Sequence, residues 1–287
     1  MKLSNWLTNV VLLVLVVALS LLTYITNTKN KTNSIIPSLT TLDPQLVSTI
    51  KINKNDNQTV LNKQNNEWRI IQPIEVKANQ LRVGSLLKLL TINIYAQYPI
   101  EDIDLSQYGL SDSVLNIEID NTRIRFGSTN PINDKRYILI NNNMYLIEDN
   151  FFPLINSQLG TLVDHRLFPD DSEMTKIQTG NFSLTKNDKG HWVSSNNASS
   201  DKINKTVTYW KNAQSFGVHD YVQRKTLEDI SITFNNSKAS TRLIVTDKEP
   251  WLIIARPELG LEYHFDETYI DKLLSTEYND STIEDDR

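Results

Sequence analysis

The chain has 287 residues, of which 39% are hydrophobic and 22% are charged, and it carries a formal net charge of −5. This length suits a membrane segment followed by one large domain or two small ones, and the composition is sufficient for a globular core. The acidic balance argues against nucleic acid as a partner, because phosphate-binding surfaces are rich in Lys and Arg. The chain has no cysteine, which excludes disulfides, thiolate metal sites and a cysteine nucleophile.

An uncharged stretch near the N-terminus, residues 6–25, reads WLTNVVLLVLVVALSLLTYI. About 20 apolar residues in a helix cross the hydrocarbon core of a bilayer. The sequence therefore predicts a transmembrane signal anchor within residues 1–28. Lys2 lies on one side of the stretch, and Lys29 and Lys31 lie on the other, so the positive-inside signal is divided. We expect the N-terminus in the cytoplasm, because the start of a nascent chain usually stays there while the polar remainder is exported.

A cleaved signal peptide is the alternative. Its apolar region would be residues 10–19, with a weak small-residue cleavage site at Ala18–Leu19–Ser20. The apolar run continues past this site to Ile25, which favours an uncleaved anchor. Residues 29–45 are predicted to form a polar tether, and residues 276–287 are predicted to be an acidic disordered tail.

Residues 46–160 contain short strand-like stretches and one amphipathic helix, predicted over residues 78–93. Alternation of apolar and polar residues predicts three strands before this helix and four after it, and a closing helix or turn follows. The apolar face of the helix has the i, i+3, i+4, i+7 spacing and is formed by Val83, Leu86, Leu87 and Leu90. The predicted strands are residues 46–52, 58–63, 67–71, 114–119, 122–127, 136–140 and 144–148, and the closing segment is residues 150–159.

Residues 174–275 repeat this order. A helix is predicted over residues 200–214, with Ser200 as its N-cap, and a closing helix is predicted over residues 266–274. The strands predicted around them are residues 174–180, 182–187, 191–195, 229–235, 240–247, 250–257 and 261–265.

In both halves a tryptophan lies at the same distance before a valine of the predicted helix. Trp68 lies fifteen residues before Val83, and Trp192 lies fifteen residues before Val207. The sequence thus predicts an α+β fold in which a β-β-β-α-β-β-β-β-α module with mostly antiparallel sheets occurs twice, joined by residues 161–173. We interpret Trp68 and Trp192 as structural residues that seal each helix against its sheet, and stacking on a ligand is the alternative.

No catalytic, cofactor-binding or metal-ligating residue is predicted. The four histidines, His165, His191, His219 and His264, lack the spacing of a zinc site. Residues 101–104 are rich in carboxylates but lack the glycine and terminal glutamate of a calcium loop. The sequence contains no P-loop, no G-x-G-x-x-G and no G-x-S-x-G motif. Enzymatic activity and a cofactor are therefore not expected.

Asp164 and Arg166 lie between the two halves. Residues two apart point to the same side of an extended chain, so these side chains could join the halves by hydrogen bonds or an ion pair. We interpret the pair as part of a structural hinge, and contact with a partner protein is the alternative.

The first half contains several short motifs in a fixed order. Their residues are Trp68, Pro73, Ala78, Tyr108, Gly109, Leu110, Gly127, Tyr137, Asp164 and Arg166. These motifs resemble DUF4340, a bacterial membrane-anchored envelope domain of unknown function. The resemblance covers residues 66–168, and the second half matches only loosely. Two departures are visible: Asn79 stands where the family has an acidic residue, and residues 111–113 lack the usual proline.

This resemblance implies a single-pass protein of the bacterial inner membrane with an exported α+β domain in the periplasm. It also implies an accessory role, because relatives occur near auxiliary subunits of gliding-motility-type ABC transporters. We therefore expect a non-enzymatic scaffold or accessory subunit of an envelope transport or assembly complex, with an envelope or membrane protein as its partner. The alternative is an envelope hydrolase, or a glycan- or lipid-binding protein, with a site between the two halves.

Overall fold

The computed structural model describes residues 10–21, 38–111, 113, 115–168, 173–235 and 239–276. The chain divides into two compact units, residues 1–38 and residues 39–287. In the first unit, residues 10–21 are helical. No helix among the described residues is long and apolar enough to cross a membrane. The other residues of the predicted anchor, much of the predicted tether and nearly all of the predicted acidic tail lie outside the described residues.

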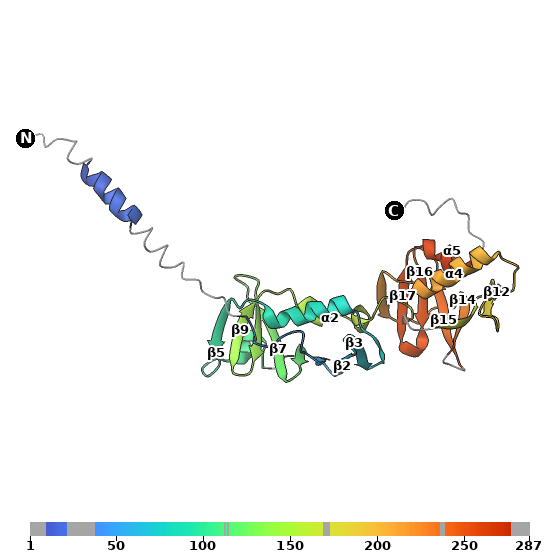
Figure 1. Cartoon of the computed structure of the whole chain (residues 1–287). Helices are drawn as coiled ribbons and strands as arrows, with labels where there is room; N and C mark the ends of the chain where they lie inside the picture. Colours follow the sequence, from blue (N-terminus) through green and yellow to red (C-terminus); the bar gives the residue numbers. More distant parts are fainter. Residues whose placement is uncertain are drawn as a thin grey trace, which may run out of the picture. The chain divides into compact units, whose positions relative to one another are not determined.

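The second unit has an α+β fold with two antiparallel sheets, which confirms the predicted class (Figure 1). The first sheet has nine strands in the order β4-β3-β2-β1-β6-β7-β8-β9-β5. Its strands are β1 (Thr49–Lys54), β2 (Asn57–Gln64), β3 (Glu67–Gln72), β4 (Val76–Lys77), β5 (Ala96–Pro99), β6 (Leu115–Ile119), β7 (Thr122–Thr129), β8 (Arg136–Ile140) and β9 (Asn143–Ile147).

The second sheet has eight strands in the order β12-β11-β10-β14-β15-β16-β17-β13. Apart from β4, this is the strand order of the first sheet. Its strands are β10 (Met174–Gln178), β11 (Ser183–Lys186), β12 (Trp192–Ser194), β13 (Gly217–Asp220), β14 (Glu228–Phe234), β15 (Ser240–Asp247), β16 (Leu252–Arg256) and β17 (Leu261–Phe265).

The sequence analysis missed β4, β5 and β13, so five strands rather than four follow the helix in each half. β5 and β13 each pair with the last strand of their half at the edge of the sheet. Each of these strands has only four residues, of which at most one is buried, so neither shows an alternating apolar pattern. β5 reads AQYP and β13 reads GVHD, and neither contains the run of β-branched residues by which a buried strand is recognised.

Short helices connect and cover the sheets. α2 begins after Asn79, whose side chain accepts a hydrogen bond from the backbone N–H of Arg82, so asparagine caps this helix as well as an acidic residue does. The N-cap of α4 is Ser199 rather than the predicted Ser200. The helices of the first half are α2 (Gln80–Leu87), η1 (Lys88–Thr91), η2 (Leu105–Tyr108), α3 (Phe152–Ile155) and η3 (Leu159–Leu162). Those of the second half are α4 (Ser200–Asn212), η4 (Pro257–Leu259) and α5 (Thr268–Leu274).

The two tryptophans occupy matching positions in the sheets. Trp68 pairs with Lys63 between β3 and β2, and Trp192 pairs with Lys186 between β12 and β11. Trp68 is buried, and the side chain of Gln80 at the start of α2 bonds both its backbone N–H and its carbonyl, at 2.8 and 2.9 Å. Trp192 is partly buried and packs against the apolar core. Both tryptophans therefore contact the apolar core, and the sealing role predicted for them stays a prediction.

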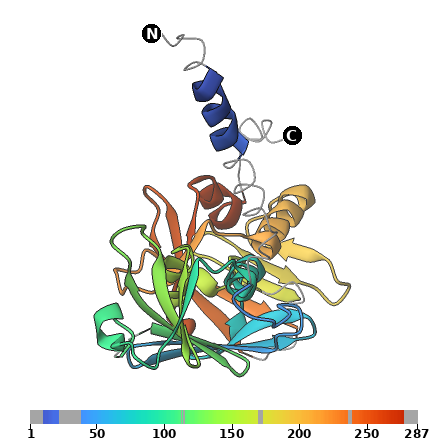
Figure 2. The ribbon, with the colours of Figure 1, turned by 90° about the vertical axis from the view of Figure 1, so that its left-hand side faces the viewer.

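In the second half, α4 and α5 contact each other and lie side by side (Figure 2). The buried Trp210 of α4 donates a hydrogen bond from Nε1 to the carbonyl of Leu273 in α5, at 2.9 Å. Ile203 of α4 is also buried, as its helical spacing with Trp210 predicts. The two helices therefore cover the sheet as one packed layer.

A connecting segment, residues 162–167, pairs with both halves of the second unit. On the first-half side, Val163 forms an antiparallel bridge with Ala78, and the N–H of Asp164 donates to the carbonyl of Lys77 at 2.9 Å. On the second-half side, Arg166 forms an antiparallel bridge with Gln214. One buried apolar cluster contains side chains from both sheets and from this segment. The two sheets are therefore joined by backbone hydrogen bonds and by a continuous core.

We predict that Gly160→Ala destabilises the fold, because an added Cβ would overlap the carbonyl of Val218 in β13 and would lie 2.9 Å from the Cα of His219. Backbone atoms cannot move aside cheaply, so the free energy of unfolding should fall by about 1–3 kcal/mol. Gly84→Ala is the matched control, because nothing lies within 4 Å of its added Cβ and the helix should gain about 0.5–1 kcal/mol. Urea unfolding of both variants measures the difference, and equal stability would contradict the close contact of η3 with β13.

Candidate functional site

Asp164 and Arg166 form an ion pair within the connecting segment. The two Asp164 oxygens accept hydrogen bonds from Arg166 Nε at 3.2 Å and Nη2 at 2.8 Å, and Oδ1 also accepts from the backbone N–H of Arg166 at 3.0 Å. Burial disfavours the charged carboxylate, but the bonds from Arg166 outweigh it, so the pKa of Asp164 is lowered. This ion pair thus fixes the local conformation of the connecting segment. It lies where the backbone hydrogen bonds of the segment change from the first half to the second.

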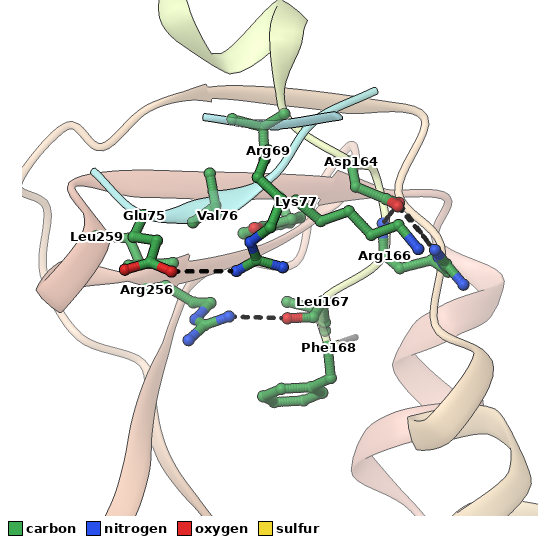
Figure 3. A pocket seen from close by; sticks show the side chains of 12 residues that line it. Arg69, Glu75, Val76, Lys77, Asp164, Arg166, Leu167, Phe168, Arg256 and Leu259 are labelled. Carbon is green, nitrogen blue, oxygen red and sulfur yellow. Dashed lines mark hydrogen bonds and ion pairs between the residues drawn. The ribbon is translucent and has the colours of Figure 1, made fainter. Parts of the chain in front are cut away.

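A cavity of about 140 Å³, named here the connector cavity, opens beside this ion pair. Its walls come from β3 and β4 of the first sheet, from the connecting segment and from β16, η4 and β17 of the second half (Figure 3). Four of the lining side chains are cationic and two are carboxylates. The lining residues are Arg69, Glu75, Val76, Lys77, Val163, Asp164, Arg166, Leu167, Phe168, Arg256, Leu259 and Tyr263.

Each cation of the connector cavity has an acidic partner. Figure 3 shows Arg69 beside Glu75 and Arg166 beside Asp164. The other ion pairs are Lys77 with Glu67 and Arg256 with Glu258. Arg256 also donates from Nη1 to the carbonyl of Leu167 at 2.9 Å, so the second half holds the connecting segment by a side chain as well as by backbone bonds.

A buried tyrosine, Tyr263 of β17, completes the cavity wall. Burial raises the pKa of its hydroxyl to about 12, and the positive charge of Arg256 only partly opposes this shift. The hydroxyl therefore stays protonated at neutral pH and keeps its O–H donor.

A second cluster of ionisable groups lies on the other face of β17, around Glu262. The Glu262 carboxylate is almost fully buried and accepts two hydrogen bonds from Arg224, at 2.8 and 2.9 Å, and one from the backbone N–H of Val222. Its Oε1 lies 2.9 Å from Nε2 of His264. Burial opposes ionisation of Glu262, but these bonds outweigh it and lower its pKa.

Two histidines that the sequence analysis treated separately meet in this cluster. The rings of His219 and His264 lie 4.5 Å apart between centroids. His219 pairs with Glu262 across β13 and β17, and His264 pairs with Gly217, so all four residues share one face of the sheet. Burial and the nearby His264 lower the pKa of His219. The sequence does show that Glu262 and His264 lie on one face of a strand. Because β13 was not predicted, however, nothing in the sequence indicated that His219 lies beside them.

Two aromatic side chains, Phe216 and Trp251, stand beside this cluster. Their rings lie 5.3 Å apart in an edge-to-face arrangement, and each ring also contacts the ring of His264. They are 53% and 47% exposed. This pair, named here the aromatic patch, was not identified from the sequence, because its two members are far apart along the chain.

Among the carboxylates of residues 101–104, Asp104 has a local structural role. Asp104 caps η2 by accepting bonds from Ser106, and these bonds lower its pKa. No group of three or more His, Asp or Glu side chains that could hold a metal ion occurs within the described part of the chain.

A larger cavity of about 660 Å³ lies between β1 and β2 on one side and residues 155–162 with Asp220 on the other, and most of its lining side chains are polar.

Two antiparallel sheets of one strand order, joined through a paired segment, define a class of two-sheet α+β proteins. Within this class, the chain belongs to the family described as "Domain of unknown function (DUF4340)", whose model matches residues 68–251. The match continues through most of the second half, well beyond the residues 66–168 on which the sequence resemblance rested. No curated protein and no solved structure matches the chain.

We predict that Glu262→Gln lowers the free energy of unfolding at neutral pH by about 2–4 kcal/mol, because Arg224 and His264 lose a buried carboxylate partner. The folded pKa of Glu262 lies below its ordinary value of 4.5. The contribution of the Glu262 carboxylate to the free energy of unfolding is therefore complete above the ordinary pKa. It is lost as the pH falls through the lower pKa of the folded state. The stability difference between wild type and variant should accordingly shrink between about pH 5 and pH 2.

The control for this experiment is Asp229→Asn, which removes the carboxylate of a surface ion pair with Arg242. Both partners are more than half exposed, so its effect should stay below about 1 kcal/mol. Urea unfolding at several pH values measures both variants. A pH-independent difference for Glu262→Gln would contradict the assignment of a charged Glu262 in the folded state.

Proposed function

We propose that this protein is a non-enzymatic scaffold or accessory subunit of an envelope transport or assembly complex. In this proposal residues 6–25 anchor the chain in the bacterial inner membrane, and the two-sheet unit lies in the periplasm and binds a protein partner. We also infer that the common strand order of the two sheets reflects an internal duplication. The single observation that carries the binding role is the aromatic patch of Phe216 and Trp251.

The aromatic patch has the properties of a protein-binding surface. Large aromatic side chains supply much of the energy of protein interfaces when they are held in one orientation before binding. Phe216 and Trp251 contact each other and the ring of His264, and His264 is held by the buried Glu262. The patch therefore offers exposed apolar area on a fixed support, which favours a partner that buries both rings.

The ionisable clusters support a structural role. Glu262 uses both carboxylate oxygens to accept hydrogen bonds from Arg224, and Asp164 uses both oxygens to bond Arg166. A general base must be free to accept a proton from a substrate. Since these two carboxylates are held by guanidinium groups and have lowered pKa values, they stabilise the fold more readily than they abstract protons.

The support for the membrane location is the sequence. Residues 6–25 contain no charged side chain and have the length of a bilayer-spanning helix. Residues 10–21 within this stretch are helical, and their large apolar side chains are exposed. A helix with apolar residues on all sides requires an apolar environment, which a bilayer provides.

A second candidate function is the binding of a glycan between the two halves. The cavity of about 660 Å³ favours it, because this volume is within the ordinary range of small-molecule sites, about 300–1,000 Å³. Its walls carry amide, hydroxyl and charged groups, among them Gln58, Thr59, Ser157 and Gln158, which can bond the hydroxyls of a sugar.

The accessory role is tested by placing a photo-cross-linking amino acid at position 216 of the full-length chain in its native host. We expect the chain to stay in the membrane pellet after a carbonate wash and to form one dominant cross-link, to an envelope or membrane protein of a transport or assembly system. The matched control is the same amino acid at position 132, because Ile132 is 91% exposed and lies between β7 and β8 of the first sheet, whereas β13 and β16 belong to the second sheet.

Three results would contradict this proposal. Release of the chain by carbonate would exclude the anchor. An identical set of cross-links from positions 216 and 132 would exclude the aromatic patch as a specific surface. A cross-link to a protein outside the envelope would exclude the assigned partner.

A further inference from the structure

The cations that line the connector cavity are less exposed than most of the carboxylates that pair with them. The side chains of Lys77, Arg166 and Arg256 are 13%, 24% and 16% exposed, and that of Arg69 is 31% exposed. The partner carboxylates of Lys77, Arg69 and Arg256 belong to Glu67, Glu75 and Glu258, which are 55%, 73% and 45% exposed. Water screens exposed charges more strongly than buried ones, so these three exposed carboxylates offset the charge of the cations only in part.

The one carboxylate deep in the cavity does not cancel this charge. Asp164 bonds Arg166 through both of its oxygens, so the two form a pair with no net charge. The remaining cations are Arg69, Lys77 and Arg256. The contact between Arg69 and Glu75 is 3.8 Å long, which is beyond hydrogen-bond distance, so a ligand can compete for this guanidinium.

The cationic groups are also positioned before any ligand arrives. Arg256 is held by the carbonyl of Leu167 at 2.9 Å and by Glu258 at 3.0 Å, and its guanidinium lies over the ring of Phe168. The Tyr263 hydroxyl contributes a neutral donor to the same cavity. Guanidinium groups and hydroxyl donors held in place match the planar or tetrahedral oxygens of an oxyanion.

The size of the cavity limits the ligand. Its volume of about 140 Å³ is below the range of about 300–1,000 Å³ that is usual for sites enclosing whole small molecules. The volume of the connector cavity is sufficient for a single oxyanion group. Several cations around one small space favour a dianion over a monocarboxylate.

We propose that the connector cavity is a binding site for a phosphate group, with Arg69, Lys77 and Arg256 as its cationic ligands and Tyr263 as a hydroxyl donor. Because this group would contact β3 and β4 of the first sheet and β16 and β17 of the second, its binding would strengthen the junction of the two sheets. The site goes beyond the proposed accessory role and does not rest on it, since the aromatic patch lies on the other face of the second sheet.

The test is calorimetric titration of the full-length chain with inorganic phosphate, with potassium chloride at the same ionic strength as the reference. We expect saturable binding and a rise in melting temperature with phosphate, because a ligand that binds only the folded state stabilises it. Arg256→Gln and Arg69→Gln should each weaken phosphate binding by about tenfold or more, the loss expected for one charge-assisted contact. Arg242→Gln, a surface arginine paired with Asp229, is the matched control and should bind as the wild type does.

Should Arg256→Gln fail to fold, Arg69→Gln decides the result, because its long ion pair with an exposed carboxylate contributes little to stability. A parallel titration with glycerol phosphate shows whether the phosphate group comes from a larger molecule or from the free ion. Binding of both compounds indicates a phosphomonoester on a larger molecule, and binding of inorganic phosphate alone indicates the free ion. The proposal is overturned when neither compound binds more strongly than chloride, or when Arg242→Gln weakens binding as much as Arg69→Gln.

Discussion

The fold depends on the backbone pairing of residues 162–167 with both halves of the two-sheet unit. The N–H groups of Asp164 and Asn79 donate to carbonyls across the junction with the first half, and those of Leu167 and Ser215 do the same across the junction with the second half. Buried backbone groups must be bonded, because an unpaired one costs as much as a lost hydrogen bond. A linker whose backbone groups bonded to only one half would leave the other half free to move.

This pairing explains why the candidate site lies where it does. It brings β3 and β4 of the first sheet close to β16 and β17 of the second, so that Arg69 and Arg256 line one cavity although they are far apart in the sequence. The Asp164–Arg166 pair, at the centre of the segment, fixes the backbone at the change from one pairing partner to the other. The Asp164–Arg166 pair and the phosphate site proposed beside it therefore depend on the same pairing of the connecting segment.

Much of the fold could be predicted from sequence patterns, and the failures have physical reasons. The hairpin of β6 and β7 was predicted because Ile117, Ile119 and Ile124 alternate with polar residues, and all three are fully buried. The matching positions of Trp68 and Trp192 were visible because each lies fifteen residues before a valine of the predicted helix. β5 and β13 were missed because each has only four residues and buries at most one of them, so neither shows such an alternation. The cap at Ser199 was misplaced by one residue because Ser200 beside it is equally suited to the role.

The candidate sites could be predicted only in part. Asp164 and Arg166 are neighbours in the sequence, so their pairing could be anticipated. The connector cavity, the aromatic patch and the group of Glu262, Arg224 and His219 require knowledge of which strands lie together. That information comes from long-range pairing between β13 and β17 and between the connecting segment and both halves. A pattern within one stretch of sequence does not contain it.

Hydrogen exchange of the full-length chain, followed by mass spectrometry, tests the central role of the connecting segment most directly. The amides of Asp164 and Leu167 should exchange as slowly as those of the central strands β1 and β14, and both sheets should open with one common free energy. Fast exchange in residues 162–167, with separate opening of the two sheets, would show that the segment is a flexible linker and would contradict this account.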